Sequence, residues 1–262
     1  RFLDFYSGEL GRKFKVHIKI DTGMKRIGFD VKMAFKNIQQ VFKNKNLDIE
    51  GIYTHFATSE SKDKSFAKLQ LNKFKELLHL LKKAGYEFPI VHSANSCAIL
   101  DLKDSYFDMV RPGLLLYGYY PSDEVKNRID LKPVMNLKSK VTYIKRLEPD
   151  TSVSYGRTYY TRKKTFVGSI PIGYGDGYWR ALSNKGKVLI NGKYYPIIGN
   201  ITMDWLMINL GEKTNVKVGD DVLLIGNENG KYTGADKIAS MVKSIPYEVI
   251  CSVADRVQRI YF

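Results

Sequence analysis

The fold of this chain is decided by the stretch Val16-His17-Ile18-Lys19-Ile20-Asp21-Thr22-Gly23-Met24-Lys25-Arg26-Ile27-Gly28. Its first half alternates apolar and polar side chains, which predicts a β-strand over residues 16–22. A turn containing glycine follows and carries the charged residues Asp21, Lys25 and Arg26. In α/β proteins the functional side chains collect where a strand ends and its loop begins. The stretch therefore predicts an α/β fold with a functional residue after its first strand.

The same arrangement recurs along the first half of the chain. Further strands are predicted over 49–56, 89–95 and 109–118, and helices over 31–43, 63–83 and 96–101. Alternation of strand and helix is typical of parallel βαβ units, whose strand ends lie on one side of the sheet. The sequence therefore predicts one site built from successive strand ends, with the candidate residues Arg26, His55, Ser96 and Arg111.

The pattern changes near residue 125, which predicts a domain over 1–125 and a second over 126–262. In the second domain strands follow strands, and the turn pairs Asn191-Gly192 and Asn229-Gly230 are typical of β-hairpins. We predict strands over 134–147, 165–173, 187–191, 194–199, 205–210 and 221–225, a helix over 234–243, and a last strand pair over 247–261.

The first domain is too short for a complete barrel of eight parallel strands, because it contains four strand–helix units. Residues Phe2 to Arg12 read as a helix that enters the first strand. We therefore expect the chain to be truncated at its N-terminus, at the middle of a barrel.

Composition narrows the classes of function. The chain has 262 residues, 44% of them hydrophobic, and no apolar run approaches the ~20 residues that span a membrane. The net charge of +15 is spread over lysines along the chain and no nucleic-acid module is recognisable, so we expect neither a membrane nor a nucleic-acid partner. No spacing of metal ligands stands out. With only Cys97 and Cys251, and no apolar leader, we expect a cytoplasmic protein.

Eight short segments, in order, carry a resemblance to a known family. They are Lys19-Ile-Asp-Thr-Gly-Met-Lys-Arg26, Thr54-His-Phe-Ala-Thr58, Ala94-Asn-Ser96, Arg111-Pro-Gly113, Val153-Ser-Tyr-Gly156, Ile172-Gly-Tyr-Gly-Asp-Gly177, Thr202-Met-Asp204 and Tyr247-Glu-Val-Ile-Cys251. The chain resembles alanine racemase, a fold-type III pyridoxal-phosphate enzyme, from Val16 to Tyr261. The resemblance implies the C-terminal half of a (β/α)8 TIM-type barrel followed by a mostly antiparallel β domain.

The resemblance also implies an activity, a cofactor and a partner. The family interconverts L-alanine and D-alanine with pyridoxal 5'-phosphate, as a homodimer whose active sites are shared across the interface, and supplies D-alanine for cell-wall precursors. Its cofactor is anchored as a Schiff base by a lysine in a segment similar to Val-Val-Lys-Ala-Asn-Ala-Tyr-Gly. No such segment occurs in this sequence. We therefore expect the full-length protein to be active and this chain alone to be inactive.

The resemblance assigns cofactor contacts to six residues. An arginine at the position of Arg111 hydrogen-bonds the pyridine nitrogen, and since a guanidinium keeps its protons, that nitrogen stays unprotonated, which favours racemisation over transamination. His55 matches a histidine that stacks on the cofactor ring. The phosphate contacts are Ser96, the backbone N–H groups of Gly113 and Leu114, and Tyr247. Ser96 also fits a helix N-cap, and both readings stand.

The same resemblance assigns the substrate side of the site. Arg26 contacts the cofactor's phenolic oxygen and the substrate, and Lys19 matches a lysine that is carbamylated in many members. An unmodified Lys19 paired with a carboxylate is the alternative. Tyr155 matches the base that acts in the partner's site, opposite the anchoring lysine. The remaining matches are Met203 in the partner's substrate pocket and Asp204 and Tyr174 at its entrance.

Departures from the family pattern and other readings remain. Asn200 stands where many relatives carry arginine, and Trp205 stands where glutamine is common. Either change could alter substrate breadth, so a broad-spectrum or serine racemase stays open, as does a catalytically silent binding fragment or pseudoenzyme. A related ornithine or diaminopimelate decarboxylase uses a carboxylate at the cofactor nitrogen, and Arg111 argues against it. The histidines His17, His79 and His92 are interpreted as structural.

Overall fold

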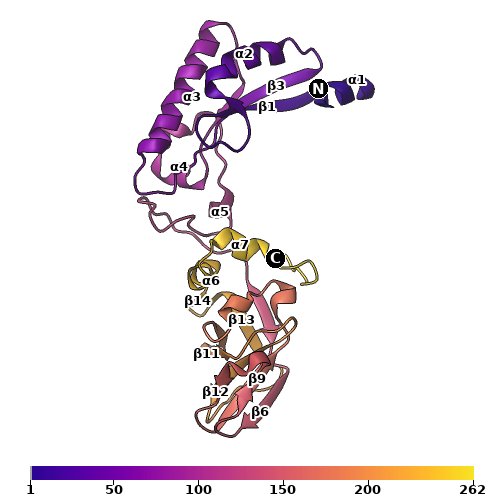
Figure 1. Cartoon of the computed structure of the whole chain (residues 1–262), viewed down its shortest axis with the longest axis vertical. Coiled ribbons are helices and arrows are strands. Elements are labelled where there is room, and N and C mark those ends of the chain that lie inside the picture. Colours follow the sequence, from indigo (N-terminus) through magenta and orange to yellow (C-terminus); the bar gives the residue numbers. More distant parts are fainter. Residues whose placement is uncertain (1) are drawn as a thin grey trace. The chain divides into compact units, whose positions relative to one another are not determined.

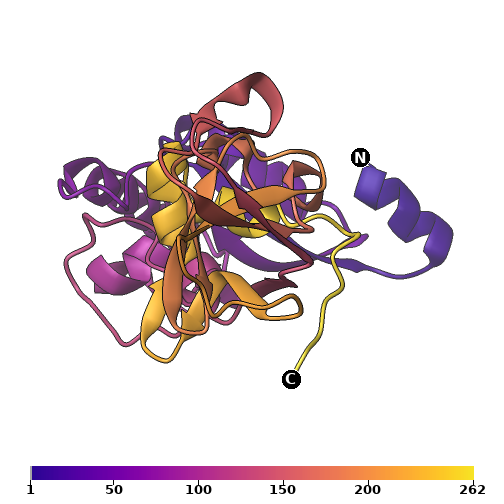
Figure 2. The same ribbon diagram turned by 90° about the horizontal axis from the view of Figure 1, so that it is seen from below.

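The computed structural model describes residues 2–262 and divides them into two compact units. The first unit contains residues 2–116 and 120–130, and the second contains residues 117–119 and 131–262. Figures 1 and 2 show the chain from two directions, with the first unit in indigo to magenta. Each unit has its own sheet and its own core.

The first unit is a parallel sheet with helices. Its strands are β1 (Phe14–Asp21), β2 (Phe29–Asp30), β3 (Leu47–Tyr53) and β4 (Ile90–His92), in the order β2-β1-β3-β4, and every pair is parallel. Its helices are α1 (Phe2–Leu10), α2 (Val31–Phe42), α3 (Ser65–Lys83), α4 (Ser96–Asp101), the short 3-10 helix η1 (Lys103–Ser105) and α5 (Gly113–Leu116). The predicted parallel α/β architecture is confirmed.

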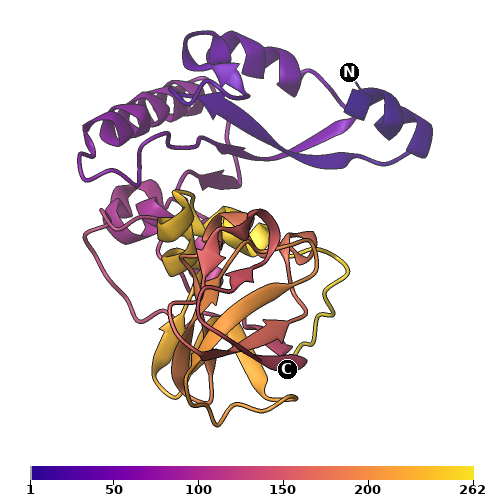
Figure 3. The same ribbon diagram turned by 60° about the horizontal axis from the view of Figure 1, so that its bottom comes forward.

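The alternation of β1 decides which of its side chains reach the core. Ile18 and Ile20 are buried in a cluster with side chains of α2 and α3, among them Ile38 and Phe74. Figures 1 and 3 show α2 and α3 on the same side of the sheet. Because successive strand residues point to opposite faces, Lys19 and its neighbours at alternate positions belong to the other face. The helices therefore leave that face to polar side chains.

The second unit is an antiparallel β domain, as predicted. One eight-stranded sheet has the order β14-β13-β10-β11-β12-β9-β6, with β5 on β13, and β7 pairs with β8 separately. The strands are β5 (Leu137–Lys140), β6 (Tyr143–Leu147), β7 (Ser152–Val153), β8 (Tyr159–Tyr160), β9 (Thr165–Ile170), β10 (Lys187–Ile190), β11 (Lys193–Ile198), β12 (Leu206–Gly211), β13 (Asp221–Glu228) and β14 (Lys231–Thr233). The helices are η2 (Tyr155–Arg157), η3 (Tyr174–Asp176), η4 (Arg180–Leu182), α6 (Ala235–Val242) and α7 (Pro246–Cys251).

The two turn pairs read from the sequence close hairpins. Asn191 and Gly192 both have positive φ, 48° and 71°, and join β10 to β11. Asn229 and Gly230, with φ of 51° and 75°, join β13 to β14 in the same way. Positive φ at both central residues is what a tight two-residue hairpin requires.

Three predicted strands are wrong. The segment 109–118 makes a single parallel bridge, from Met109 to His92, and then turns into α5, because Pro112 cannot donate to a ladder. The segment 247–261 contains no strand: α7 occupies its start, and Pro246 stands at the helix's first turn, where proline is favoured. The segment 134–147 is two strands, β5 and β6, rather than one.

No helix among residues 2–262 combines the length and the apolar character that a membrane crossing needs.

A buried ion pair fixes the segment after α5 to the first unit. Lys64 Nζ lies 3.0 Å from Asp101 Oδ2, with side chains 8% and 3% exposed, and Asp101 also accepts from the backbone of Asn127 at 3.0 Å. Removing one partner of a buried pair leaves an uncompensated charge. We expect Lys64→Met to lower the free energy of unfolding by about 3–5 kcal/mol, measured by urea titration.

The matched control for that variant is the exposed pair of Lys75 and Asp104, 3.6 Å apart in the same unit. Exposed pairs contribute at most about 1 kcal/mol, so Lys75→Met should change the unfolding free energy by no more than that. Equal effects of the two substitutions on the unfolding free energy would contradict the claim that the buried pair of Lys64 and Asp101 stabilises the first unit.

Candidate functional site

Arg111 is the centre of the polar site in the first unit. Its Nη2 donates to the carbonyl oxygens of Thr54 at 3.0 Å and Ser93 at 3.1 Å, and contacts His55 Nδ1 at 3.2 Å. Its Nη1 bonds to His92 Nδ1. Thr54 and His55 directly follow β3, and Ser93 follows β4. The Arg111 guanidinium is therefore hydrogen-bonded to the C-terminal ends of both β3 and β4.

An aromatic side chain holds the same guanidinium from another direction. The Arg111 guanidinium carbon lies 5.2 Å from the ring centre of Tyr53, and that ring stacks on His92 with centres 4.7 Å apart. Lys19 Nζ lies 6.0 Å from the Tyr53 ring as well. Burial lowers the pKa of Arg111, but a guanidinium keeps its charge at any accessible pH. The site therefore contains a fixed positive charge.

The two histidines beside Arg111 are neutral. Burial, followed by the charge of Arg111, lowers the pKa of both His55 and His92 to about 4. Arg26 and Lys19 also contribute to the low pKa of His55. A neutral imidazole accepts a hydrogen bond at one nitrogen and donates from the other. Both rings can therefore accept from Arg111 at Nδ1.

Lys19 lies among positive charges. Burial, and then the charge of Arg26, lowers the pKa of Lys19; the charge of Asp21 acts against this and that of Arg111 with it. Gly28 packs against the backbone of Lys19: a Cβ at Gly28 would lie only 2.9 Å from the Lys19 carbonyl oxygen. The φ of +118° at Gly28 also favours glycine. Across the described residues 2–262, none of Lys19, Arg26 and Arg111 forms an ion pair with a carboxylate.

The structure thus brings Lys19, Arg26, His55 and Arg111 close enough to influence one another's charge. Three cations around a neutral histidine form a site that attracts an anion. The alternative for Lys19, a pairing with a carboxylate of this chain, is not seen within residues 2–262. Asp21 instead accepts from the backbone of Gly23 and Lys25, which fixes the turn after β1.

Three of the four expected phosphate contacts, Ser96, Gly113 and Leu114, lie at the starts of the short helices α4 and α5. Ser96 Oγ donates to the Pro112 carbonyl at 2.5 Å, and the Arg111 N–H donates to the Ala94 carbonyl at 2.9 Å, so the starts of α4 and α5 are joined. The N-cap of α4 is Asn95, whose side chain accepts from Ala98, so the reading of Ser96 as that cap is wrong. The α5 helix begins at Gly113, and Leu114 is buried. Tyr247 belongs to the second unit, on α7. The phosphate role of these residues stays a prediction.

In the second unit, Tyr155 sits on a strained and exposed loop. Its side chain is 76% exposed, and the neighbouring Ser154 and Arg157 have positive φ of 66° and 47°. Asn200 Nδ2 donates to the Tyr155 carbonyl at 2.8 Å, and Ser154 Oγ donates to the Asn200 carbonyl at 2.6 Å. Such backbone conformations persist only when their surroundings hold them. Asn200 therefore holds the loop that presents Tyr155.

The other three candidates of the second unit lie on two joined loops. The N–H groups of Tyr174 and Gly175 donate to the carbonyls of Thr202 and Met203 at 3.0 and 2.9 Å. Arg256 Nε binds Asp176 at 2.8 Å, and its Nη2 binds Asp204 at 2.7 Å. Arg256 was missed by sequence reasoning, since it lies far along the chain in a segment read as a strand.

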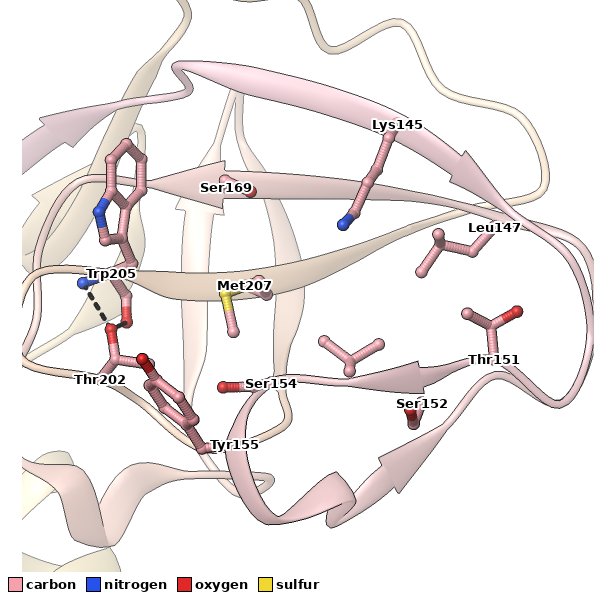
Figure 4. A pocket seen from close by; sticks show the side chains of 11 residues that line it. Lys145, Leu147, Thr151, Ser152, Ser154, Tyr155, Ser169, Thr202, Trp205 and Met207 are labelled. Carbon is pink, nitrogen blue, oxygen red and sulfur yellow. Dashed lines mark hydrogen bonds between the residues drawn. The ribbon is translucent and has the colours of Figure 1, made fainter.

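A hollow of about 420 Å³ is lined by residues 151–155, by Thr202 and Trp205, and by side chains of β6, β9 and β12. Figure 4 shows Tyr155, Thr202 and Trp205 at one end of it, with Lys145 at the other. The backbone N–H of Trp205 donates to Thr202 Oγ1 at 3.1 Å. Trp205 thus lines the same hollow as Tyr155.

Sequence reasoning also missed the role of His92 and His17, which it assigned to structure alone. His92 bonds to Arg111, and His17 Nδ1 lies 2.8 Å from His92 Nε2. The available signal was weak: His17 and Lys19 share one face of β1 by the two-residue period. Which residue of β4 His17 contacts depends on the register of β1, β3 and β4.

The low pKa of His92 predicts a dependence of stability on pH. The folded pKa of about 4 is below the ordinary 6.5, so the folded state binds the proton later than the unfolded chain does. The stabilisation that neutral His92 contributes is fully present above pH 6.5 and is lost as the pH falls towards 4. His92 is 4% exposed, and we expect its protonation to lower the free energy of unfolding by roughly 2 kcal/mol between pH 7 and 4.5.

The measurement is urea unfolding at both pH values for the wild type and His92→Gln, because the difference between them isolates this residue from the carboxylates. His79→Gln is the control, as His79 is exposed on α3. The same pH dependence in wild type and His92→Gln would contradict a neutral, buried His92.

Family models match nearly the whole chain. The model of the alanine racemase N-terminal domain matches residues 3–121, and that of the alanine racemase C-terminal domain matches residues 134–261. Among curated proteins, alanine racemase 2 of Caldanaerobacter subterraneus subsp. tengcongensis is 48% identical over 252 residues, which are 96% of this chain and 65% of that protein. The chain thus spans about two thirds of the length of this relative.

Solved structures of the same family have the same fold. The alanine racemase of Clostridium difficile 630 is 40% identical with a TM-score of 0.93, covering 99% of this chain and 67% of that one. The enzyme of Bartonella henselae, determined with covalently bound pyridoxal phosphate, is 33% identical with a TM-score of 0.84, covering 99% and 69%.

Proposed function

The chain belongs to the alanine racemase family, and on this premise we propose that it takes part in the racemisation of alanine with pyridoxal 5'-phosphate. The observation that carries the proposal is the set of unpaired cations in the first unit, Lys19, Arg26 and Arg111, beside the neutral His55. Pyridoxal phosphate and an amino acid are both anionic, and this donor set fits them. When bound, the cofactor supplies an electron sink for the carbon that loses its proton.

Arg111 is proposed to face the pyridine nitrogen of the cofactor. It is held by Thr54, Ser93 and the two neutral histidines, so its orientation is set before anything binds. A guanidinium donates and never accepts. A cofactor nitrogen held by Arg111 would therefore stay unprotonated, which would favour racemisation over transamination. His55, Ser96, Gly113, Leu114 and Tyr247 are proposed to complete the cofactor contacts.

Lys19 is proposed to be carbamylated. Its pKa is lowered, so a larger fraction of its amine is uncharged; that amine can form an N–C bond to carbon dioxide and release one proton to solvent. The product is an anion next to Arg26, which would neutralise part of the positive cluster and hold the Arg26 guanidinium for contact with the substrate. A carbamate accounts for the surroundings of Lys19, whose pKa is lowered by two arginines. Within residues 2–262, Lys19 forms no ion pair with a carboxylate.

Tyr155 is proposed to hold or accept the proton on one face of the substrate carbon, in the site of a partner subunit of a homodimer. Its exposed side chain and its fixed loop support this role. A phenol has an ordinary pKa near 10, so the partner's cations must favour its anion. Met203, and Asp204 and Tyr174 at the entrance, are proposed to line the same pocket. Both cysteines are free, and we propose that the protein is cytoplasmic.

Asn200 and Trp205 are the observations that favour a second candidate, a racemase of broader amino-acid range. Asn200 binds the Tyr155 carbonyl, and Trp205 lines the same hollow as Tyr155. Assays of the full-length protein with L-alanine, L-serine and L-ornithine separate the two candidates. We expect alanine to react with the highest kcat/KM, and equal rates for all three would favour the broader racemase.

The 262-residue chain contains no segment that resembles the one carrying the anchoring lysine. We expect it to show no racemisation by itself with added pyridoxal phosphate, whereas the full-length protein converts L-alanine to an equal mixture of enantiomers. Racemisation by the 262-residue chain would show that another lysine anchors the cofactor. No racemisation by the full-length protein would favour a silent binding protein.

A further inference from the structure

A line of polar contacts runs across the sheet of the first unit, from Arg111 to a carboxylate. His92 Nδ1 bonds to Arg111, and its Nε2 lies 2.8 Å from His17 Nδ1. His17 Nε2 lies 3.2 Å from Glu50 Oε2, and Glu50 Oε1 accepts from Lys15 at 2.5 Å. We call Glu50, His17 and His92 the relay. It is formed by side chains of β1, β3 and β4.

A glycine makes the contact between the two histidines possible. His17 is on β1 and His92 on β4, and β3 lies between these strands. Gly51 of β3 is the register partner of His17, and a Cβ at Gly51 would lie 2.4 Å from His17 Nδ1. The register shifts by a bulge between Val16 and His17, and bulges redirect side chains. The imidazole of His17 therefore crosses the middle strand at a position that admits no side chain.

The chemistry of the end groups fixes the direction of every hydrogen bond. Arginine only donates, so the bond from Arg111 exists only when a neutral His92 accepts at Nδ1 and carries its proton on Nε2. That proton is donated to His17 Nδ1, which leaves the proton of a neutral His17 on Nε2, where the carboxylate of Glu50 accepts it. The opposite tautomer of His92 would place two donors face to face and leave a buried group unsatisfied, at a cost of about 1–3 kcal/mol.

We infer that Glu50 and His17 are positioning residues for Arg111: they fix the Nε2–H tautomer of His92, so that its Nδ1 always accepts from the guanidinium. Two carbonyls and His55 direct the other nitrogen of Arg111, and the relay directs this one. The link from Arg111 to catalysis rests on the proposed function. The link from Glu50 to the tautomer of His92 does not.

The test is 15N NMR of histidine-labelled full-length protein at pH 7, with and without pyridoxal phosphate. The 262-residue sequence contains four histidines, and single substitutions of His17, His79 and His92 assign their signals. We expect His17 and His92 as single Nε2–H tautomers and the exposed His79 as a mixture. In Glu50→Leu the proton of His17 can move to Nδ1 and face His92, which then accepts at Nε2 and loses its bond to Arg111, so both relay histidines should become mixtures. Glu50→Gln should restore the single tautomers because an amide oxygen also accepts. Single tautomers retained in Glu50→Leu, or an Nδ1–H tautomer in the wild type, would overturn the inference.

Asp48→Leu is the matched control, since Asp48 is exposed on the same strand and its substitution leaves the relay intact. Glu50→Leu should lower kcat for alanine by on the order of tenfold with little change in KM, while Asp48→Leu and Glu50→Gln stay within about twofold of wild type. Equal losses in Glu50→Leu and Asp48→Leu would overturn the positioning role. If the wild type does not racemise alanine but shows the expected tautomers and their loss in Glu50→Leu, the proposed function fails and the relay stands.

Discussion

Replacing Tyr155 by phenylalanine in the full-length protein is expected to lower the rate of alanine racemisation by on the order of 10³-fold, within the range of a single general acid–base group. The change removes one oxygen from an exposed side chain and leaves the ring in place. The loop should keep its shape, since Asn200 holds it through the Tyr155 carbonyl rather than through the side chain. The rate is measured from both enantiomers, and both must fall equally because the equilibrium is unchanged.

The matched control is Tyr143→Phe. Tyr143 is also exposed, on β6 of the same unit, and has no assigned part in the reaction. Its activity should remain within about twofold of wild type. A similar loss in both variants would mean that removing a surface hydroxyl perturbs the unit as a whole, and would contradict a chemical role for the Tyr155 phenol.

Replacing Arg111 by glutamine should lower racemisation by on the order of 10²-fold and raise the share of transamination, because the pyridine nitrogen would no longer face a group that keeps its protons. The substitution also leaves His92 and the Thr54 carbonyl without their donor. Release of pyruvate from alanine measures transamination, and a coupled D-alanine assay measures racemisation. Arg146→Gln, at an exposed arginine on β6, is the control and should have little effect.

An unchanged product ratio in Arg111→Gln would contradict the proposed contact with the cofactor nitrogen, even if the overall rate falls. A loss of rate alone follows equally from disordered strand ends. The ratio of the two reactions therefore carries the interpretation.

The parts of the fold that follow local rules were predictable. The period-two pattern of β1 and the long apolar stripe of α3 each define one buried face, and both elements are where the sequence placed them to within two residues. The pairs Asn191-Gly192 and Asn229-Gly230 define hairpins because few other residues accept positive φ. The segments after Arg111 and after Ile245 were predicted wrongly, since in each a proline overrides the β propensity of its neighbours.

The contacts that organise the site depend on tertiary register, which no short pattern contains. His17 meets His92 because β3 places Gly51 between them, and Arg256 meets Asp176 and Asp204 from a distant segment. The residues themselves were recognisable from their strand-end positions and from the family resemblance. Their roles toward cofactor and substrate stay predictions until the variants above are measured.

The most direct test of the central claim is solvent deuterium incorporation at the α-carbon of alanine, catalysed by the full-length protein with pyridoxal phosphate. With the wild type, starting from either L- or D-alanine, the label should appear in the product enantiomer. With Tyr155→Phe, exchange should persist from the enantiomer whose proton faces the anchoring lysine and fall at least ~10²-fold from the other. Exchange from both enantiomers at the wild-type rates in Tyr155→Phe would contradict the account.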